Sequence, residues 1–350
     1  MWALYFVCAA LLGSLTIYAI TGGADYGGGV LELFASGPRA DKQREVVEHA
    51  IGPIWESNHV WLILVIVMLF CGFPEVYATI MTSLFVPVVL MLIGIVLRGS
   101  AFSFRSYGAG GGEMQRIWGR VFAVASLITP YLLGVIIAAI ASGQIPENPR
   151  VIGDFVFPWL TPFCMSVGLF TLMLFSYLAA TYATLEPADP AVSDDFRLRA
   201  IGFAFAAGVM AAEVLLLSRT GAPRIWRGLV DRAWTWPLIW LTSGLALGAL
   251  FCLWTRRYQI ARICAAGQVA LIIWGWAFAQ FPVMVEPSLT IYNASAPPIT
   301  LRLLAIALAV GVVVLLPSFG YLMLTFKIHS RRLPFPHRRT SAERARRPAD

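Results

Sequence analysis

The polar residues best able to carry chemistry stand at the start of a long apolar run, in residues 51–61 (IGPIWESNHVW). On a helix, Glu56 and His59 are three positions apart and share one face. A carboxylate there could take up and release protons at the mouth of a path, with Trp55, Asn58 and His59 around it. The alternative interpretation is structural: Glu56 and Asn58 satisfy backbone N–H groups at the helix start or pair with a nearby arginine.

The histidines do not form a ligand set. His59 stands alone in its apolar segment, because His49 lies in a charged loop and the other two lie near the C-terminus, at His329 and His337. No two of them share a plausible transmembrane site for a haem or a metal ion. The five cysteines also stand singly, without a CxxC pair. We therefore expect no metal or haem bound by this chain alone, and a structural hydrogen bond for His59.

Two further carboxylates lie in or beside apolar runs. Asp25 follows the first run and is surrounded by glycines in residues 22–29 (GGADYGGG). Because glycines let backbones approach closely, we expect packing there, with Asp25 capping a helix or pairing a cation; a flexible turn is the alternative. Glu213 lies inside a later run, where it either pairs with Arg219 or faces a polar bundle interior. We favour the pair with Arg219.

The composition places these groups in a membrane protein. Of 350 residues, 59% are hydrophobic and 13% are charged, and the mean hydropathy is +0.74. A globule this apolar could not cover its own surface with polar groups, so lipid must be its main solvent. A soluble enzyme, a nucleic-acid-binding protein and a secreted disulfide scaffold are all excluded as leading interpretations.

Apolar runs long enough to cross a bilayer occur nine times. The expected spans are 2–21, 54–72, 76–97, 117–142, 156–183, 200–218, 235–254, 260–281 and 303–327. Residues 59–98 are too long for one crossing, so we place a tight turn at residues 72–75 (GFPE), where proline cannot continue a helix. The first span lacks the marks of a signal peptide and is expected to be retained. The expected fold is an all-α integral membrane domain over residues 1–328.

The distribution of lysine and arginine predicts the orientation. An odd number of spans puts the termini on opposite sides, and a cytoplasmic C-terminus leaves 20 of the 26 basic residues inside. The inner residues outside the tail are Arg39, Lys42, Arg44, Arg98, Arg105, Arg116, Arg120, Arg197, Arg199, Arg256, Arg257 and Arg262. We therefore expect the N-terminus outside, although a basic cluster between Arg219 and Arg232 departs from the pattern. Residues 329–350, rich in arginine and proline, are expected to be a disordered cytoplasmic tail attracted to anionic lipid.

Several short motifs, in order along the chain, resemble subunit II of cytochrome bd-type quinol oxidases. Residues 23–29 (GADYGGG) resemble the family's G-F-D-L-G-x-G, and residues 52–61 (GPIWESNHVW) its G-P-x-W-(D/E)-x-N-x-V-W. Residues 73–78 (FPEVYA) are similar to F-P-x-V-Y-A, and residues 97–105 (LRGSAFSFR) to the end of its third helix. Residues 281–296 look like its outer loop before the last helix.

The resemblance implies two related nine-helix subunits, built mostly as four-helix bundles. In this family, subunit I binds the haems b and d and oxidises quinol, and the acidic residue that Glu56 matches lies in a proton path from the cytoplasm. Relatives often carry a further carboxylate where this chain has Ser103, so the upstream part of that path would rely on water and Ser103. Asp25, Arg98 and Glu213 are assigned to structural or partner contacts.

The expected function is that of a haem-free subunit of a quinol oxidase in the bacterial inner membrane. Its expected partners are subunit I and membrane lipids, with no nucleic acid. A small accessory subunit and a quinone or lipid bound in this chain stay open. A secondary transporter is one alternative, but paired broken segments, its usual sign, are not seen in the sequence. A purely structural membrane scaffold is the other.

Overall fold

The computed structural model describes residues 1–51, 55–107, 112–146 and 149–330. The side chains at positions 49, 51, 55, 56, 106, 107, 112 and 322–330 are not part of that description. The packing of the backbone divides the chain into one unit of Met1–Ala305 and a second of Ile306–Asp350. The described part of the second unit is the continuation of the last helix as far as Ser330. Most of the predicted tail therefore lies outside the described residues.

The described chain is almost entirely helical. Its helices are α1 (Trp2–Leu33), α2 (Ala40–Ile51), α3 (Trp55–Gly72), α4 (Pro74–Ser83), α5 (Phe85–Tyr107), α6 (Gly112–Ser142), α7 (Ile152–Val156), α8 (Pro162–Ala183), α9 (Pro190–Gly221), α10 (Pro223–Val230), α11 (Thr235–Trp254), α12 (Tyr258–Gln280) and α13 (Pro298–Ser330). Two short antiparallel strands, β1 (Val283–Val285) and β2 (Leu289–Thr290), form a hairpin between α12 and α13.

The first helix is longer than the sequence predicted. The expected span ended at residue 21, but α1 continues through the glycine-rich segment to Leu33, so Asp25 lies inside a helix and does not cap one. Close packing accounts for this extension. A Cβ atom at Gly27 would collide with the backbone carbonyl of Phe175 in α8, and one at Gly29 with the hydroxyl of Ser126 in α6. The expected close approach is confirmed, and the flexible turn is wrong.

Eight of the described helices are long and apolar enough to cross a membrane, or nine if the bent pair α3–α4 counts as one span. The predicted turn at residues 72–75 is confirmed, because Ser57–Gly72 and Pro74–Ser83 meet at 116°. The predicted span 76–97 is wrong in its bounds: α4 ends at Ser83, and the long apolar helix is Phe85–Arg105. The span predicted over 156–183 begins later, at Pro162, where Thr161 caps the helix. Helix α11 has the predicted bounds, 235–254.

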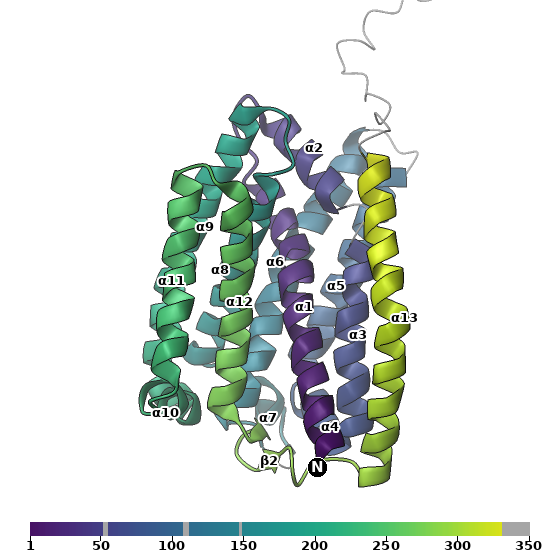
Figure 1. Ribbon diagram of the computed structural model, residues 1–350, viewed down its shortest axis with the longest axis vertical. Coiled ribbons are helices and arrows are strands. Elements are labelled where there is room, and N and C mark those ends of the chain that lie inside the picture. The colour runs from purple at the N-terminus through teal and green to yellow at the C-terminus, as the bar shows by residue number, and fades with distance from the viewer. Residues whose placement is uncertain (52–54, 108–111, 147–148, 331–350) are drawn as a thin grey trace, which may run out of the picture. The chain divides into compact units, whose positions relative to one another are not determined.

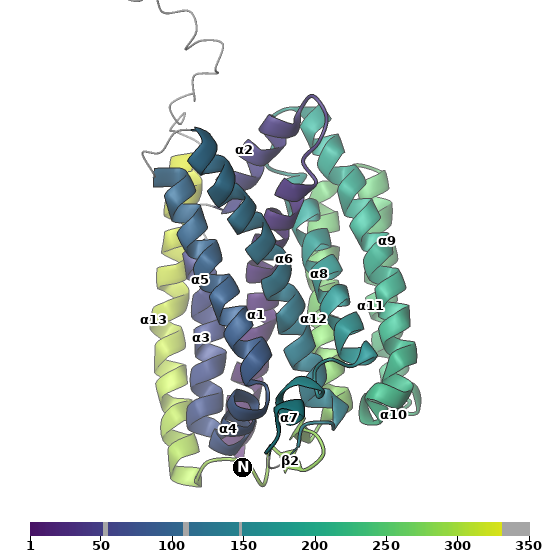
Figure 2. The same cartoon turned by 180° about the vertical axis from the view of Figure 1, so that it is seen from behind.

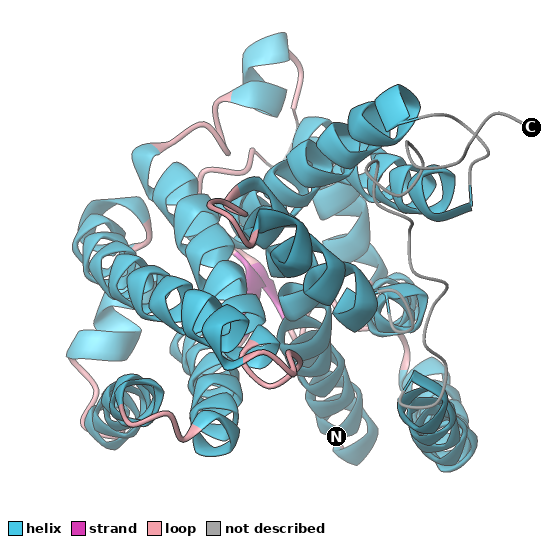
Figure 3. Cartoon of the chain, turned by 90° about the horizontal axis from the view of Figure 1, so that it is seen from above, coloured by secondary structure: helices cyan, strands magenta, loops and turns pink. Residues whose placement is uncertain are grey.

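Helix α1 lies at the centre of the unit formed by residues 1–305. It packs against α3, α6, α8 and α12 (Figures 1 and 2). Helix α5 packs on α6, and α9 packs on α8. Viewed from above, some long helices are seen end-on and others cross the view obliquely (Figure 3). Side chains that point from α5 and α3 towards α1 therefore enter the middle of the unit.

The connections of this unit gather at two ends. Helix α2 and the link between α8 and α9 lie at one end, which we call the α2 end (Figures 1 and 2). Helices α4, α7 and α10, the β1–β2 hairpin and the N-terminus lie at the other, which we call the hairpin end. Each end would face one side of a membrane crossed by the helices between them.

Candidate functional site

A buried ion pair between Asp25 of α1 and Arg98 of α5 is the centre of the candidate site. The side chains are 4% and 1% exposed, and Arg98 Nη2 lies 2.7 Å from Asp25 Oδ1. Arg98 Nη1 donates to Asp25 Oδ2 at 3.0 Å, so the contact is bidentate. Arg98 also donates to the Asp25 backbone carbonyl and to the Ser126 hydroxyl. The pairing of Asp25 with a cation, one of two roles expected for it, is confirmed.

Aromatic rings enclose the guanidinium of Arg98. Its Cζ atom lies 4.8 Å from the ring centroid of Tyr26 and 4.8 Å from that of Phe122. Both rings present an electron-rich face to the cation, which lowers the cost of holding it away from water. The hydroxyls of Tyr26 and Tyr18 are 3.1 Å apart. Polar atoms thus continue along α1 from Asp25 towards the hairpin end.

A second buried ionic cluster lies two helical turns towards the α2 end. Glu32 follows Asp25 by seven residues on α1, and Arg105 follows Arg98 by seven on α5. Seven residues make about two helical turns, so the spacing keeps each pair on the same face of its helix. Arg105 Nη1 donates to Glu32 Oε2 at 2.6 Å, and its Nη2 donates to Glu48 of α2 at 3.0 Å. The two arginines form successive cross-links between α1 and α5.

Of the predicted proton path, His59 lies beside the tyrosines that adjoin the Asp25–Arg98 pair, and Asn58 precedes it on α3. The His59 ring centroid is 6.2 Å from that of Tyr18 and 6.2 Å from that of Tyr26. Asn58 is buried, and within the described ranges no donor reaches its Oδ1 atom. Position 56 lies in the first turn of α3, one turn before His59. The side chains of Trp55 and Glu56 fall outside the described part, so their roles stay predictions.

Ser103, the remaining member of the predicted path, is not gathered with the others. It is exposed, whereas Arg105 two positions later is buried. Two residues correspond to about 200° around a helix, so the two side chains leave α5 on nearly opposite faces. A proton path through Ser103 would have to run along the outer face of α5 in this chain.

Glu213 of α9 has a different partner from the one that the sequence favoured. The hydroxyl of Ser166 in α8 donates to Glu213 Oε1 at 2.8 Å. Arg219 forms no ion pair with it within the described structure. Six residues separate the two on the helix, which puts their side chains on different faces. Glu213 therefore links α9 to α8 through this hydrogen bond.

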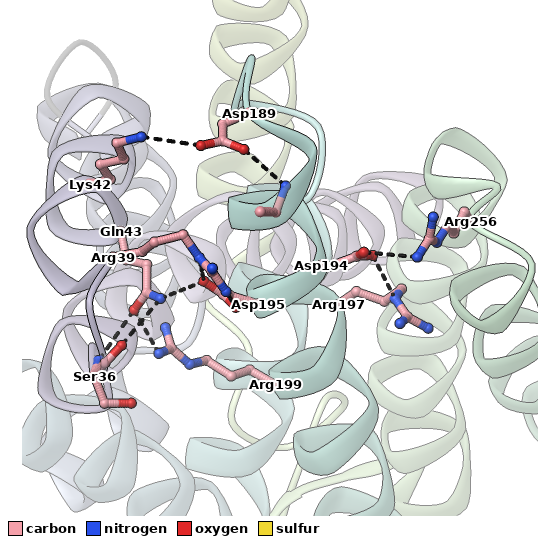
Figure 4. A network of polar contacts seen from close by, with 11 residues as sticks. Ser36, Arg39, Lys42, Gln43, Asp189, Asp194, Asp195, Arg197, Arg199 and Arg256 are labelled. Atoms are coloured by element: carbon pink, nitrogen blue, oxygen red, sulfur yellow. Dashed lines mark hydrogen bonds and ion pairs between the residues drawn. The ribbon is translucent and has the colours of Figure 1, made fainter.

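A polar network ties α2 to the start of α9 at the α2 end (Figure 4). Arg39 donates to both carboxylate oxygens of Asp195, at 2.8 and 2.6 Å, and Gln43 donates to Asp195 at 2.7 Å. The Asp195 carboxylate raises the pKa of Arg39 above its usual value. The Ala191 backbone N–H, and next the ammonium of Lys42, hold the pKa of Asp189 below its usual range. This network fixes α2 against α9.

The same network reaches the turn between α11 and α12. Asp194 accepts a hydrogen bond from Arg197 at 3.1 Å and from Arg256 at 2.8 Å, as Figure 4 shows. Arg256 adopts a positive φ of 60° in that turn. Since Asp194 and Asp195 belong to the first turns of α9, one helix start connects α2 on one side with the α11–α12 turn on the other.

The described residues gather no cluster of metal-binding side chains. No group of three or more His, Cys, Asp and Glu side chains lies together among them. His59 lies beside tyrosine rings, and the carboxylates of Asp25 and Glu32 pair with arginines.

The sequence reading missed Glu32, Glu48 and Arg105 as a cluster. The signal was available: a seven-residue spacing separates Asp25 from Glu32, and the same spacing separates Arg98 from Arg105. A first span that ends at residue 21 hides this spacing, because it leaves Asp25 and Glu32 in a loop, where helical spacing has no meaning. Glu48 carries no such signal, because it belongs to a separate helix.

The comparisons with known proteins point to one family. Residues 3–326 match the family described as cytochrome bd terminal oxidase subunit II. The chain is 25% identical over 338 residues to subunit 2 of the cytochrome bd-I ubiquinol oxidase of Escherichia coli (strain K12), covering 86% of this chain and 88% of that protein. It is 22% identical over 320 residues to the putative cytochrome bd menaquinol oxidase subunit II of Bacillus subtilis (strain 168), covering 88% and 91%.

A solved structure shares the fold. A chain in the structure of bd oxidase from Geobacillus thermodenitrificans superposes with a TM-score of 0.78 at 21% identity, and the match covers 93% of this chain and 99% of that chain. The backbone arrangement is thus common to both chains, whereas individual side chains differ at most positions.

Proposed function

Because this chain belongs to the family of cytochrome bd terminal oxidase subunit II, we propose that it supports a haem-bearing subunit I and provides the oxidase with a route for proton uptake. It is a multi-pass bacterial membrane protein and a subunit of a quinol oxidase complex. Reduction of dioxygen to water consumes protons. A subunit that carries them from the cytoplasm to the partner makes that consumption contribute to the membrane potential.

The family supports the proposed division of labour between the subunits. Haems b and d are assigned to subunit I, as the resemblance to the family implies. In this chain, His59 packs on tyrosine rings. The residues of this chain bind the partner, exclude lipid from the path and hold protonatable groups in place.

The α2 end is assigned to the cytoplasmic side. Three basic residues of α2 and its preceding loop, Arg39, Lys42 and Arg44, lie there, and arginines of the α9 start and the α11–α12 turn join them in Figure 4. Basic residues accumulate on the cytoplasmic side of membrane proteins. This orientation places the N-terminus outside, and it puts the start of α3 and Glu48 at the cytoplasmic end.

The observation that carries the proposal is the buried Asp25–Arg98 pair beside the α3 turn that contains Asn58 and His59. Polar groups at membrane depth are costly and are usually kept for function. The pair is neutral as a whole, and both carboxylate oxygens of Asp25 accept hydrogen bonds from Arg98, so it places polar groups inside the span without a net charge. Glu56, one turn before His59, is the residue to which we assign the moving proton.

The proposal is tested with Glu56→Gln in the purified, haem-containing complex. Because glutamine cannot accept and release a proton, we expect oxygen consumption per haem to fall about ten-fold or more. Glu113→Gln is the matched control, since Glu113 is an exposed carboxylate in the first turn of α6 and should tolerate the change. Turnover of the Glu56 variant equal to that of the unaltered complex would remove Glu56 from the path and overturn the proposed proton route.

A further inference from the structure

Three charged side chains at the α2 end form a cluster that the proposed function does not yet use. Arg105 bonds both oxygens of Glu32, Nη1 to Oε2 at 2.6 Å and Nη2 to Oε1 at 3.1 Å. The same Nη2 atom donates to Glu48 Oε2 at 3.0 Å. We call Glu32, Glu48 and Arg105 the Arg105 triad. Its two carboxylates meet at a single nitrogen atom.

The triad leads from water to the buried interior. The side chain of Glu48 is 30% exposed, whereas those of Glu32 and Arg105 are 7% and 10% exposed. Glu48 belongs to α2, which is the amphipathic helix at this end, and Glu32 belongs to α1 at the centre of the unit. The partly exposed Glu48 and the buried Glu32 thus lie on the same nitrogen atom of Arg105.

The charge of the triad favours the uptake of one cation. Two carboxylates share one guanidinium, which leaves one negative charge in excess, whereas Asp25 and Arg98 cancel each other. A buried negative charge in excess is costly, and binding a proton removes that cost. The neutral Asp25–Arg98 pair has no such need. The two clusters therefore differ in chemical role although they share one geometry.

We propose that the Arg105 triad is the inlet of the proton path at the α2 end. The Glu48 carboxylate accepts a proton from water, and a bridging water molecule relays it to a carboxylate oxygen of Glu32, which leaves Glu48 ionised again. Arg105 is a positioning residue that holds the two carboxylates together in every step. This inference rests on the proposed function, because a proton inlet has a purpose only if the chain conducts protons.

The Arg105 triad also supplies carboxylates near the helix end where relatives often carry one at the position of Ser103. Ser103 has no carboxylate and leaves α5 on the face away from Arg105. Glu32 and Glu48 supply two carboxylates on the inner side of the same helix end instead. The upstream part of the path is thereby assigned to α1 and α2.

One aromatic ring separates the triad from the inner pair. The Phe122 ring centroid lies 5.7 Å from Arg105 Cζ and 4.8 Å from Arg98 Cζ, so the ring lies against both guanidiniums. Two turns of α1, about 10 Å, separate Glu32 from Asp25. Water molecules would have to bridge this distance beside Phe122, so Glu32 is the end of the inlet, and the onward step towards α3 is a separate one.

The experiment uses the complete purified oxidase with Glu48→Gln and, separately, Glu32→Gln. We expect oxygen consumption per haem to fall about ten-fold or more in both, with proton uptake by the reduced enzyme slowed to the same extent. Glu48→Asp, which keeps a protonatable group, should restore most of the rate. Asp41→Asn is the matched control: it removes the same charge from α2, but its side chain is fully exposed and contacts only Arg44 nearby.

The outcomes separate this inference from the proposed function. Unchanged turnover and proton uptake in the Glu48 and Glu32 variants, with Glu56→Gln slowed, would overturn the inlet and leave the proposed function standing. Normal turnover of Glu56→Gln would overturn the proposed function and the inlet with it. If Glu32→Gln fails to assemble, the variant of the partly exposed Glu48 distinguishes the two roles. Reduced thermal stability of Glu48→Gln with full turnover per haem would show that the triad only holds α2 in place and would overturn the inlet.

Discussion

Arg98 of α5 connects three helices in the described interior. Its guanidinium donates to both carboxylate oxygens of Asp25, to the Asp25 carbonyl and to the Ser126 hydroxyl, and it lies between the rings of Tyr26 and Phe122. Lysine could not make this set of contacts, because its ammonium is a point donor without a planar fork. One side chain from α5 thereby holds α1 and α6 together.

Removing Arg98 should be more damaging than removing its whole ion pair. Arg98→Met leaves Asp25 buried without a partner, which costs about 3–5 kcal/mol. We expect less assembled complex and a lower unfolding temperature. Asp25→Ala combined with Arg98→Met removes both charges and should recover part of the loss. Arg120→Met, at an exposed position of α6, is the control. A double variant as unstable as Arg98→Met alone would contradict the unpaired charge as the cause.

The residue types were readable from the sequence, but most of their partners were not. Asp25 was expected to pair a cation or cap a helix, and nothing in the sequence selected Arg98, because that contact joins helices 73 residues apart. For Glu213 the nearest basic residue was chosen, and the contact was instead Ser166 of α8. Sequence proximity is a weak guide in a bundle, where neighbours are set by helix packing.

At the scale of elements, the glycines of α1 set how closely the helices pack. Gly27 faces the backbone of Phe175 in α8, and Gly29 faces Ser126, the residue that also accepts from Arg98. Small residues at such crossings let backbones approach in membranes, where packing drives helix association. The glycine segment therefore determines both the path of α1 and the distance that Arg98 must span.

A methyl group at Gly27 tests this crossing. Gly27→Ala introduces a Cβ atom into the Phe175 carbonyl, so α1 and α8 must separate, and we expect a lower unfolding temperature of the purified complex. Gly13→Ala, on the same helix, meets nothing within 4 Å and gains about 1 kcal/mol of helix propensity. Its stability should be unchanged or higher. Equal stability of the two variants would be evidence against a tight α1–α8 crossing.

The bounds of the elements were predictable where the apolar run itself ended in polar residues. Helix α11 has the expected bounds because tryptophans and charged residues enclose it. The expectation failed for α1, since glycines were read as a helix end, although packing keeps them helical. It failed for α4 and α5 because no charged residue marks the break after Ser83, and the nearby Pro87 lies within the first turn of α5.

At the scale of the molecule, the distribution of charge predicts orientation. The two ends of the unit formed by residues 1–305 differ: the α2 end carries the ionic network of Figure 4, and the hairpin end carries Arg224 paired with Glu286. The basic cluster that departed from the sequence pattern falls on and beside α10, a short surface helix at the hairpin end. Arg224 of that cluster is neutralised by Glu286, which weakens its pull towards the cytoplasm.

Chemical labelling of single positions in intact cells tests the orientation that the proton route requires. Asp41→Cys, at the α2 end, should react with a membrane-impermeant maleimide only after the cells are opened. Asp154→Cys, in α7 at the hairpin end, should react in intact cells, because the proposed orientation turns that end outward. The unaltered chain, with five free cysteines of its own, supplies the background. The reverse pattern would place Glu48 and position 56 outside, where no cytoplasmic proton could reach them.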